Sequence, residues 1–388
     1  MQLSVIILNY NVRYFLELCV LSVQCALENI DGEIIVVDNN SSDDSCAMIK
    51  KRFPNVKLVE NKENLGFPKG NNIGVAQAKG EYICILNPDT VVAEDTFVHV
   101  LAFAKKQKDM GIVGVKLIDG TGNFLPESKR GIPTPFVAFT KIMGLYKLFP
   151  NTFGKYYAQH LTENETGKVE ILVGAFMFLK RELYNEIGGF DENCFMYSDD
   201  IDLSYMALKT GKSNYYFHET TVIHYKGEST IKDGTYMKRF QEAMNFFYKK
   251  HFKVSLLFYF FMKIGIVFFS LVKKFQGKKN SKNIPKSYIL ISDNNSSGVN
   301  IRLKLENQLK ASVKIRSTSI GITQSFSENN KIEIIFDQNY LDFKTIIQEM
   351  QANINSGFSF KILPKLSDFL IGSDSSFDRG EVVMISDF

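Results

Sequence analysis

The sequence predicts an α/β fold in which a parallel sheet is covered by helices on both faces. Four short, mostly apolar runs in the first quarter of the chain have the composition of buried strands, at 3–8, 33–37, 56–60 and 82–86. A segment with helical spacing of apolar residues, at about 13–28, separates the first two. Apolar strands that alternate with helices are typical of parallel sheets. The length of 388 residues fits two domains.

Polar residues follow three of these strands at the point where each one ends. Tyr10 comes after the first strand, Asp38 after the second, and Asp89 after the fourth, directly behind Pro88. The carboxyl ends of parallel strands meet at one edge of a sheet, and open α/β sheets bind ligands there. These residues therefore predict a nucleotide site at that edge. No GxGxxG pattern follows the first strand, which disfavours a dinucleotide-binding fold.

The stretch 61–92 carries the loop that we expect to contact the ligand. Three glycines allow the backbone to approach a ligand or to turn with positive φ, namely Gly66, Gly70 and Gly74. Three asparagines supply amide donors and acceptors, namely Asn64, Asn71 and Asn72. Asp89 offers a carboxylate that can hold a divalent metal bridging two phosphates. The alternative is an ordinary helix-to-strand unit joined by a turn.

A second acidic cluster lies later in the chain. Further strands are expected at 112–117 and 168–179, with an irregular, proline-containing stretch between them and a short helix at 181–187 after them. Asp199, Asp200 and Asp202 then open a helix that runs to about residue 210. One or two acids serve as helix caps. Crowded carboxylates beside aromatic residues raise one pKa enough to create a base, and we favour this interpretation. His224, after a strand-like run, has either a site role or a structural one.

Composition indicates the compartment and excludes one class of partner. The five cysteines form no CxxC pair, and the chain starts directly with a strand pattern, so we expect reduced thiols, no signal peptide and a cytoplasmic protein. The segment 249–286 holds ten lysines and no acid, and without it the chain is net acidic. A basic character confined to one segment argues against nucleic-acid binding and for contact with the cytosolic face of a membrane.

Residues 254–272 are nineteen mostly apolar residues with Lys263 at the centre. A helix of this length crosses a hydrocarbon layer of roughly 30 Å. Its polar residues fall on one narrow helical face, which favours a helix lying in the membrane interface. A spanning helix and a helix buried between two domains are the alternatives.

The sequence after this segment predicts a separate small α/β unit. Strands are expected at 288–291, 332–336 and 358–363, with a helix at 340–354. No cluster of acids or histidines suggests catalysis here, so we expect an interaction or regulatory module. The predicted domains are 1–248, 249–284 and 285–388.

Six ordered motifs together resemble the family 2 inverting glycosyltransferases with the GT-A fold, a Rossmann-like nucleotide-diphospho-sugar transferase fold, and especially their rhamnosyltransferase-like branch. The motifs are IILNYN (6–11), VVDNNSSDDS (36–45), ENLGFPKGNN (63–72), GEYICILNPDT (80–90), GGFDENCFMYSDDIDL (188–203) and HYKGEST (224–230). The resemblance covers roughly residues 3–245.

The resemblance implies a role for each candidate residue. Tyr10 and Asp38 contact the base and ribose region of the donor, and Asn64, Gly66 and Asn71 belong to the same binding loop. Asp89 is the surviving acid of a DxD-type metal motif, and His224 lies near the diphosphate and the metal, which is Mg²⁺ or Mn²⁺. Asp200 is the catalytic base, supported by Asp199 and Asp202.

The resemblance implies an enzyme that moves a sugar from a nucleotide-diphosphate sugar to a glycan or lipid-linked acceptor, with inversion, in cell-surface polysaccharide synthesis. Asn87 replaces the first acid of DxD, Asp199 stands where Glu is usual, and Pro68 where a small residue is usual. The chain has no Trp, so the QxxRW motif of processive synthases is absent, which favours transfer of single sugars. The alternatives are a nucleotidyltransferase and a catalytically silent nucleotide-sugar binder.

Overall fold

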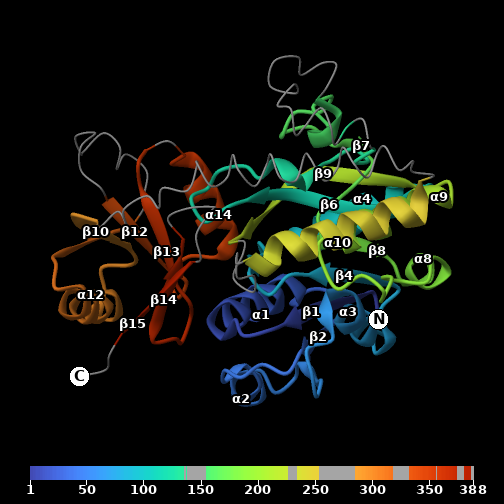
Figure 1. Ribbon diagram of the computed structural model, residues 1–388. Helices are drawn as coiled ribbons and strands as arrows, with labels where there is room; N and C mark the ends of the chain where they lie inside the picture. Colours follow the sequence, from blue (N-terminus) through green and yellow to red (C-terminus); the bar gives the residue numbers. More distant parts are fainter. Residues whose placement is uncertain are drawn as a thin grey trace.

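The computed structural model describes residues 1–134, 137, 154–225, 234–252, 285–317, 332–354, 356–373 and 380–385. These residues form two sheets, each with its own helices (Figure 1). The first sheet follows the order β3-β2-β1-β4-β8-β6-β9-β5, and β7 pairs with β9. The second follows the order β11-β10-β12-β13-β14-β15.

The amino-terminal half of the first sheet is parallel, as predicted. It consists of β1 (Leu3–Asn9), α1 (Arg13–Leu27), β2 (Gly32–Asp38), α2 (Ser45–Arg52), β3 (Lys57–Glu60), α3 (Gly66–Ala76) and β4 (Tyr82–Leu86). β1 pairs in parallel with both β2 and β4, and β2 with β3. The four strands expected from apolar runs are thus confirmed, with their shared direction.

The remainder of this sheet is mixed. It contains β5 (Thr90–Val91), α4 (Thr96–Lys106), β6 (Met110–Ile118), β7 (Gly167–Val169), β8 (Phe176–Lys180), α8 (Arg181–Glu186), α9 (Asp199–Lys209) and β9 (Ser213–His224). β8 lies antiparallel between β4 and β6, so the sheet is not wholly parallel. The prediction of a single strand at 168–179 is wrong. The chain leaves the sheet between β7 and β8, and Gly174 in that gap donates its N–H to Asp200 instead of to a strand.

Helices cover both faces of the first sheet. Residues of α1, α2 and α4 belong to one buried cluster, and residues of α3, α8 and α9 belong to another on the opposite face. Two of the loop glycines serve this packing. A Cβ at Gly74 would lie 2.6 Å from Ile6 Cγ2, and one at Gly70 would overlap the side chain of Leu8. The expectation that these two glycines approach a ligand is therefore wrong, because they let α3 pack closely on the sheet.

The carboxy-terminal sheet combines parallel and antiparallel pairs. Its elements are β10 (Ser287–Ile291), α12 (Ser296–Leu309), β11 (Val313–Arg316), β12 (Ile332–Asp337), α14 (Phe343–Ala352), β13 (Ser359–Leu363), β14 (Phe369–Gly372) and β15 (Glu381–Met384). β11, β10, β12 and β13 pair in parallel with their neighbours. β14 pairs antiparallel with both β13 and β15. One face of this sheet carries α12. The other face and α14 share a buried cluster with α1, β5 and β9. This unit therefore has no fully separate core.

The helix α10 (Gly234–His251) lies beside α9 (Figure 1). The apolar segment predicted at 254–272 lies outside the described residues. Within the described part of the chain, no helix is both long and apolar enough to cross a membrane. The irregular stretch expected at 120–168 contains, where it is described, the short 3-10 turns η1 (Pro126–Ser128) and η2 (Gly154–Tyr157).

Candidate active site

A cavity of about 310 Å³ opens at the carboxyl ends of β1 and β4. Five of the predicted site residues line it, namely Tyr10, Asn64, Gly66, Asp199 and Asp200. The other five lie outside its lining, namely Asp38, Asn71, Asp89, Asp202 and His224. The structure thus brings the end of β1, the start of α3 and the start of α9 around one space.

Asp38 shapes the loop beside the cavity. Its Oδ1 accepts hydrogen bonds from Asn9 Nδ2 at 2.7 Å and from Ser41 Oγ at 2.6 Å. Its Oδ2 accepts one from the Ser41 N–H at 2.8 Å. The side chain is buried, and both oxygens are engaged. Asp38 therefore fixes the turn after β2 and holds it against the end of β1.

Asn39, which sequence reasoning passed over, ties the glycine loop to this turn. It lines the cavity, and its Nδ2 donates to Asn64 Oδ1 at 3.3 Å and to Gly66 O at 3.1 Å. Asn64 Oδ1 also accepts from the Gly66 N–H at 3.0 Å. Asn71 is buried inside α3, where its Nδ2 donates to Phe67 O at 2.9 Å. Asn39 belongs to a run of asparagines directly after β2, and this run is the sequence feature from which its role could have been predicted.

Gly66 is the loop glycine that needs its conformational freedom. Its φ is +80°, and a Cβ there would lie 2.8 Å from Phe195 Cδ2. The Phe67 N–H donates to Phe195 O at 3.0 Å. The start of α3 and the loop before α9 therefore meet backbone to backbone, and this contact closes one side of the cavity.

Asp89 and His224 meet beside the cavity wall formed by Asn87 and Pro88. Thr90 of β5 pairs with His224 of β9, and Asp89 Oδ1 lies 3.4 Å from His224 Nε2. Both side chains are buried. Within the described residues, Asp89 Oδ1 accepts no hydrogen bond and His224 Nδ1 makes none.

This pair has the donor chemistry of a divalent-cation site. A buried carboxylate and an imidazole with unsatisfied atoms suit such an ion. No group of three or more acidic, histidine or cysteine side chains that could hold a metal occurs among the described residues.

Asp200 is held by an arginine that the sequence did not single out. Asp200 Oδ2 accepts a hydrogen bond from Arg130 Nη2 at 2.6 Å and another from the Gly174 N–H at 3.1 Å. Arg130 also donates to Leu172 O at 2.9 Å, and both side chains are buried. The adjacent basic residues Lys129 and Arg130 within an irregular stretch were the available signal. The contact orients one carboxylate oxygen and leaves Asp200 Oδ1 without a described partner.

Asp199 lines the same cavity and has a different electrostatic environment. Burial, with a further contribution from the negative charge of Asp200, raises the pKa of Asp199 to about 7. A buried carboxyl group loses the hydration that favours its ionised form, and a neighbouring charge of the same sign adds to the effect. Two adjacent acids thus differ: one carboxylate is paired with a guanidinium, and the other resists ionisation.

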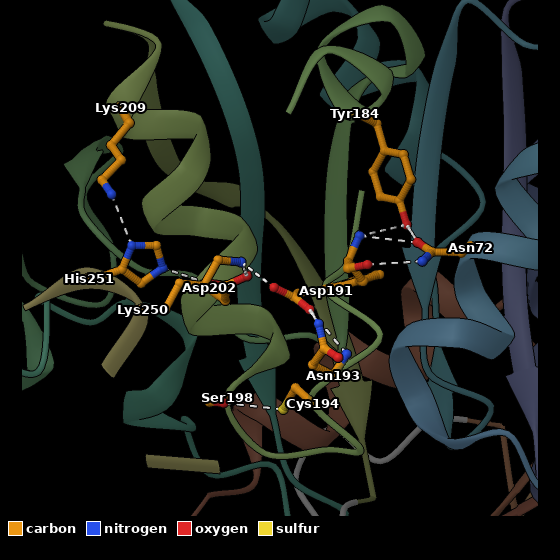
Figure 2. Close-up of polar contacts among 11 residues, drawn as sticks. Asn72, Tyr184, Asp191, Asn193, Cys194, Ser198, Asp202, Lys209, Lys250 and His251 are labelled. Atoms are coloured by element: carbon orange, nitrogen blue, oxygen red, sulfur yellow. Dashed lines mark hydrogen bonds and ion pairs between the residues drawn. The ribbon is translucent and has the colours of Figure 1, made fainter. Parts of the chain in front are cut away.

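Asp202 faces away from the cavity and joins α9 to the end of α10 (Figure 2). Its Oδ1 lies 2.5 Å from His251 Nε2, and its Oδ2 lies 2.8 Å from Lys250 Nζ. Lys250 Nζ also lies 2.7 Å from Asp191 Oδ2, and Lys209 Nζ lies 2.9 Å from His251 Nδ1. The network therefore holds the loop that leads into α9 against α10.

Aromatic side chains form the wall on the α9 side. Phe195 is 42% exposed, and the Arg239 guanidinium carbon lies 5.2 Å from the centre of its ring. Tyr197 has φ of +82°, a conformation that costs free energy in a bulky residue and often occurs at functional sites. Both rings and Arg239 line the cavity, so an occupant would meet an apolar surface and a cation.

The structure combines an α/β fold, two acids in one cavity and a carboxylate–imidazole pair beside it. These are residues that an enzyme can use, and comparison with known proteins indicates the class of enzyme. The family model "Glycosyl transferase family 2" matches residues 4–188. The N-acetylglucosaminyl-diphospho-decaprenol L-rhamnosyltransferase of Mycobacterium tuberculosis is 27% identical over 243 residues, covering 60% of this chain and 78% of the relative.

Other relatives match over smaller parts of their length. The minor teichoic acid biosynthesis protein GgaB of Bacillus subtilis is 33% identical over 126 residues, 31% of this chain and 14% of the relative. The poly-beta-1,6-N-acetyl-D-glucosamine synthase of Staphylococcus epidermidis is 26% identical over 189 residues, 48% of this chain and 40% of the relative. This chain therefore spans less than two thirds of either protein.

Among solved structures, the mannosyltransferase PcManGT of Pyrobaculum calidifontis, in complex with GDP-Man and Mn²⁺, has 19% identity and a TM-score of 0.44. That match covers 63% of this chain and 61% of the other, and a likeness of this degree does not bear on function. The sequence matches support a glycosyltransferase: the model "Glycosyl transferase family 2" covers residues 4–188, just under half of this chain, and the relative that matches over 243 residues is itself a glycosyltransferase.

Proposed function

We propose that the enzyme transfers a single sugar, with inversion, from a nucleotide-diphosphate sugar to a hydroxyl group of a glycan or lipid-linked acceptor in cell-surface polysaccharide synthesis. The names of the relatives support a role in cell-surface polysaccharide synthesis. One relative is named for a diphospho-decaprenol acceptor, and the others for the synthesis of teichoic acid and of poly-N-acetylglucosamine. The observation that carries the proposal is the acid pair Asp199–Asp200 in the same cavity as Tyr10 and Asn64.

The donor nucleotide is proposed to lie at the ends of β1 and β2. Tyr10 and Asn64 line the cavity and offer a ring and an amide to the base and ribose. Asp38 acts on the donor through the turn that it fixes, because both of its oxygens are engaged within the protein. Asn71 supports the same loop from inside α3 through its bond to Phe67 O. Gly66 allows the loop to approach the Phe195 side of the cavity.

Asp200 is proposed as the general base. Arg130 and Gly174 hold its Oδ2, so Oδ1 takes the proton of the acceptor hydroxyl. The acceptor oxygen forms its bond to the anomeric carbon as the bond from that carbon to the diphosphate oxygen breaks. A single displacement from the opposite face inverts the anomeric centre and requires no enzyme nucleophile. Asp199 supports the base from the same cavity wall, and Asp202 does so by anchoring α9.

Asp89 and His224 are the residues proposed to hold Mg²⁺ or Mn²⁺. Such an ion, when bound, neutralises the charge of the leaving nucleoside diphosphate. Asp89 Oδ1, which accepts no hydrogen bond from the described residues and lies 3.4 Å from His224 Nε2, supports the assignment. Arg239 at the cavity wall adds a cation from the protein itself. We also propose that 249–286, with its ten lysines and apolar run, brings the enzyme to the cytosolic face of the membrane and to a lipid-linked acceptor.

The test is a panel of nucleotide sugars, measured by thermal shift with and without Mn²⁺. We expect one donor class to raise Tm, and more so with the metal. Proton NMR of the product made from that donor then gives the anomeric configuration, which we expect to be opposite to that of the donor. Retention of configuration, or stabilisation by free nucleoside triphosphates but by no nucleotide sugar, would overturn the proposal.

A further inference from the structure

The structure suggests a role for the carboxy-terminal sheet and α14. We propose that the carboxy-terminal sheet and α14 hold Asp89 and His224 in position. They would thereby position the part of the active site that is proposed to bind the metal and the diphosphate of the donor. The inference rests on the proposed function of that pair.

The pair sits on a very short piece of sheet. β5 has two residues, and it is joined to β9 by only two residue pairs, Thr90 with His224 and Val91 with Ile223. The Tyr225 N–H adds a bond to Asp89 O at 3.0 Å. A ladder of this length at the end of a sheet is marginal by itself, so other contacts must hold it in place.

Alternate residues of this ladder face the carboxy-terminal unit. Val91, Ile223 and Tyr225 are buried in one cluster with residues of both β10 and α14, including Ile289 and Phe343. Side chains alternate between the two faces of a strand, so Thr90 and His224 lie on the opposite face. One face of the ladder thus carries the site, while the other is covered jointly by α1 and the carboxy-terminal unit.

Glu94, three residues beyond β5, forms hydrogen bonds with the first turn of α14. Its Oε1 accepts the N–H of Phe343 at 2.8 Å, and its Oε2 accepts the N–H of Lys344 at 2.9 Å. A carboxylate at a helix N-terminus satisfies free N–H groups and complements the helix dipole. Asp95 adds an ion pair with Lys344 Nζ at 2.6 Å. The segment that follows Asp89 is therefore fastened to the first turn of α14 at two successive residues.

The amino-terminal domain and the carboxy-terminal unit also pack closely at a second place, around Gly120 and Gly122. Gly122 has φ of +84°, and a Cβ there would lie 2.6 Å from Met350 O at the other end of α14. A Cβ at Gly120 would lie 2.8 Å from Ser373 Cβ. Contacts at both ends of α14 leave it little freedom to shift on the catalytic domain. We conclude that docking of α14 sets where Asp89 lies relative to His224.

The experiment compares Glu94→Ala with Asp342→Ala in the full chain. Asp342 caps the same helix, through its Oδ1 to the Thr345 N–H at 2.7 Å, and among the described residues it makes no hydrogen bond to the catalytic domain. It therefore controls for loss of a helix cap. The readouts are hydrogen exchange of peptides containing 89–94 and 222–225, and calorimetric binding of the donor nucleoside diphosphate with and without Mn²⁺, with no acceptor present.

For Glu94→Ala we expect at least about tenfold faster exchange in both peptides. The gain in nucleotide affinity that Mn²⁺ provides should fall about tenfold, and affinity without metal should change less than twofold. Asp342→Ala should leave both readouts near wild type. Glu94→Gln, which keeps one acceptor oxygen, is the milder variant if Glu94→Ala does not fold, and it should show the same changes in smaller degree.

Two results would overturn the proposal: wild-type exchange at 89–94 in the Glu94 variants, or equal effects of the Glu94 and Asp342 changes. A wild-type enzyme that binds no nucleotide with or without Mn²⁺ would contradict the proposed function instead. In that case the exchange data still decide whether α14 positions the pair.

Discussion

Arg130 Nη2 lies 2.6 Å from Oδ2 of Asp200, and both charged groups are buried, Asp200 in the cavity lining and Arg130 outside it. They are 70 residues apart in the sequence. A buried ion is tolerated only with a partner, so each residue needs the other. Because the guanidinium occupies one carboxylate oxygen, it also decides which oxygen of Asp200 remains for chemistry.

Arg130→Gln should destabilise the protein by about 3 kcal/mol, since it leaves a buried charge without its partner. Turnover should fall at least tenfold as Asp200 loses its orientation. Arg130→Lys should recover part of the stability but less of the turnover, because a lysine cannot bond Asp200 and Leu172 O with the same planar geometry. Denaturant unfolding and steady-state kinetics measure the two effects. Arg181→Lys, at a bond to Gly80 O, is the matched control, and an equal loss there would contradict the assignment.

Asp200→Asn should lower turnover by about 10² to 10⁴, the usual contribution of a general base. Donor binding should stay within a few-fold, because the amide retains the shape of the side chain. Isothermal titration with the donor and a coupled assay of nucleoside diphosphate release separate these quantities. Near-normal turnover in Asp200→Asn would move the base to another residue, with Asp199 as the first to test.

Asp199 makes stability depend on pH. Its pKa in the folded protein, about 7, lies above the value near 4 of an unfolded aspartate. Between these values the folded state binds more protons, so this residue lowers stability as pH rises from about 4 to 7. Asp199→Asn should therefore stabilise the protein at pH 8, on the order of 1–3 kcal/mol, and the gain should vanish near pH 4. Chemical denaturation at the two pH values checks this, and a gain independent of pH would refute it.

Asp89→Ala should weaken donor binding chiefly when Mn²⁺ is present, by at least about tenfold. EDTA should have the same effect on the unmodified enzyme and little further effect on the variant. Asp89 and His224 are the two side chains proposed to bind the metal. Replacing Asp89 therefore leaves one of the two proposed protein ligands, and the metal that contributes to donor binding is held less tightly. Calorimetry with and without metal measures the difference. Activity that survives both the substitution and EDTA would show that the metal assignment is wrong.

The lysine-rich segment 249–286 predicts binding to vesicles that contain anionic lipid. Each lysine near such a surface contributes roughly 1 kcal/mol, screened by salt, whereas insertion of the apolar run 254–272 is not screened. The protein should therefore stay on vesicles in high salt and come free in detergent. Flotation assays test this, with deletion of 254–272 as the comparison. A full-length protein that fails to float with vesicles at low salt would contradict the membrane proposal.

Local pattern predicted a good part of the fold and of the site. The four amino-terminal strands and their common direction follow from apolar runs and intervening helices, because burial on both faces leaves no polar alternation. The residues after those strands were also accessible, since the end of a run is visible in the sequence. Tyr10 was identified in this way, Asn64 and Gly66 from the loop rich in glycine and asparagine, and Asp199 and Asp200 from the acidic cluster at a helix start. All five line one cavity.

Only the tertiary structure decided the contacts between distant segments. Asp202 is two residues from Asp200, which is about 200° around a helix, so it faces Lys250 and His251 rather than the cavity. β8 inserts antiparallel between β4 and β6, although its apolar run resembles that of a parallel strand. Arg130 reaches Asp200, and Glu94 reaches α14, from 70 and about 250 residues away. Periodicity records which face of an element is buried, whereas the partner that buries it is chosen by packing of the whole chain.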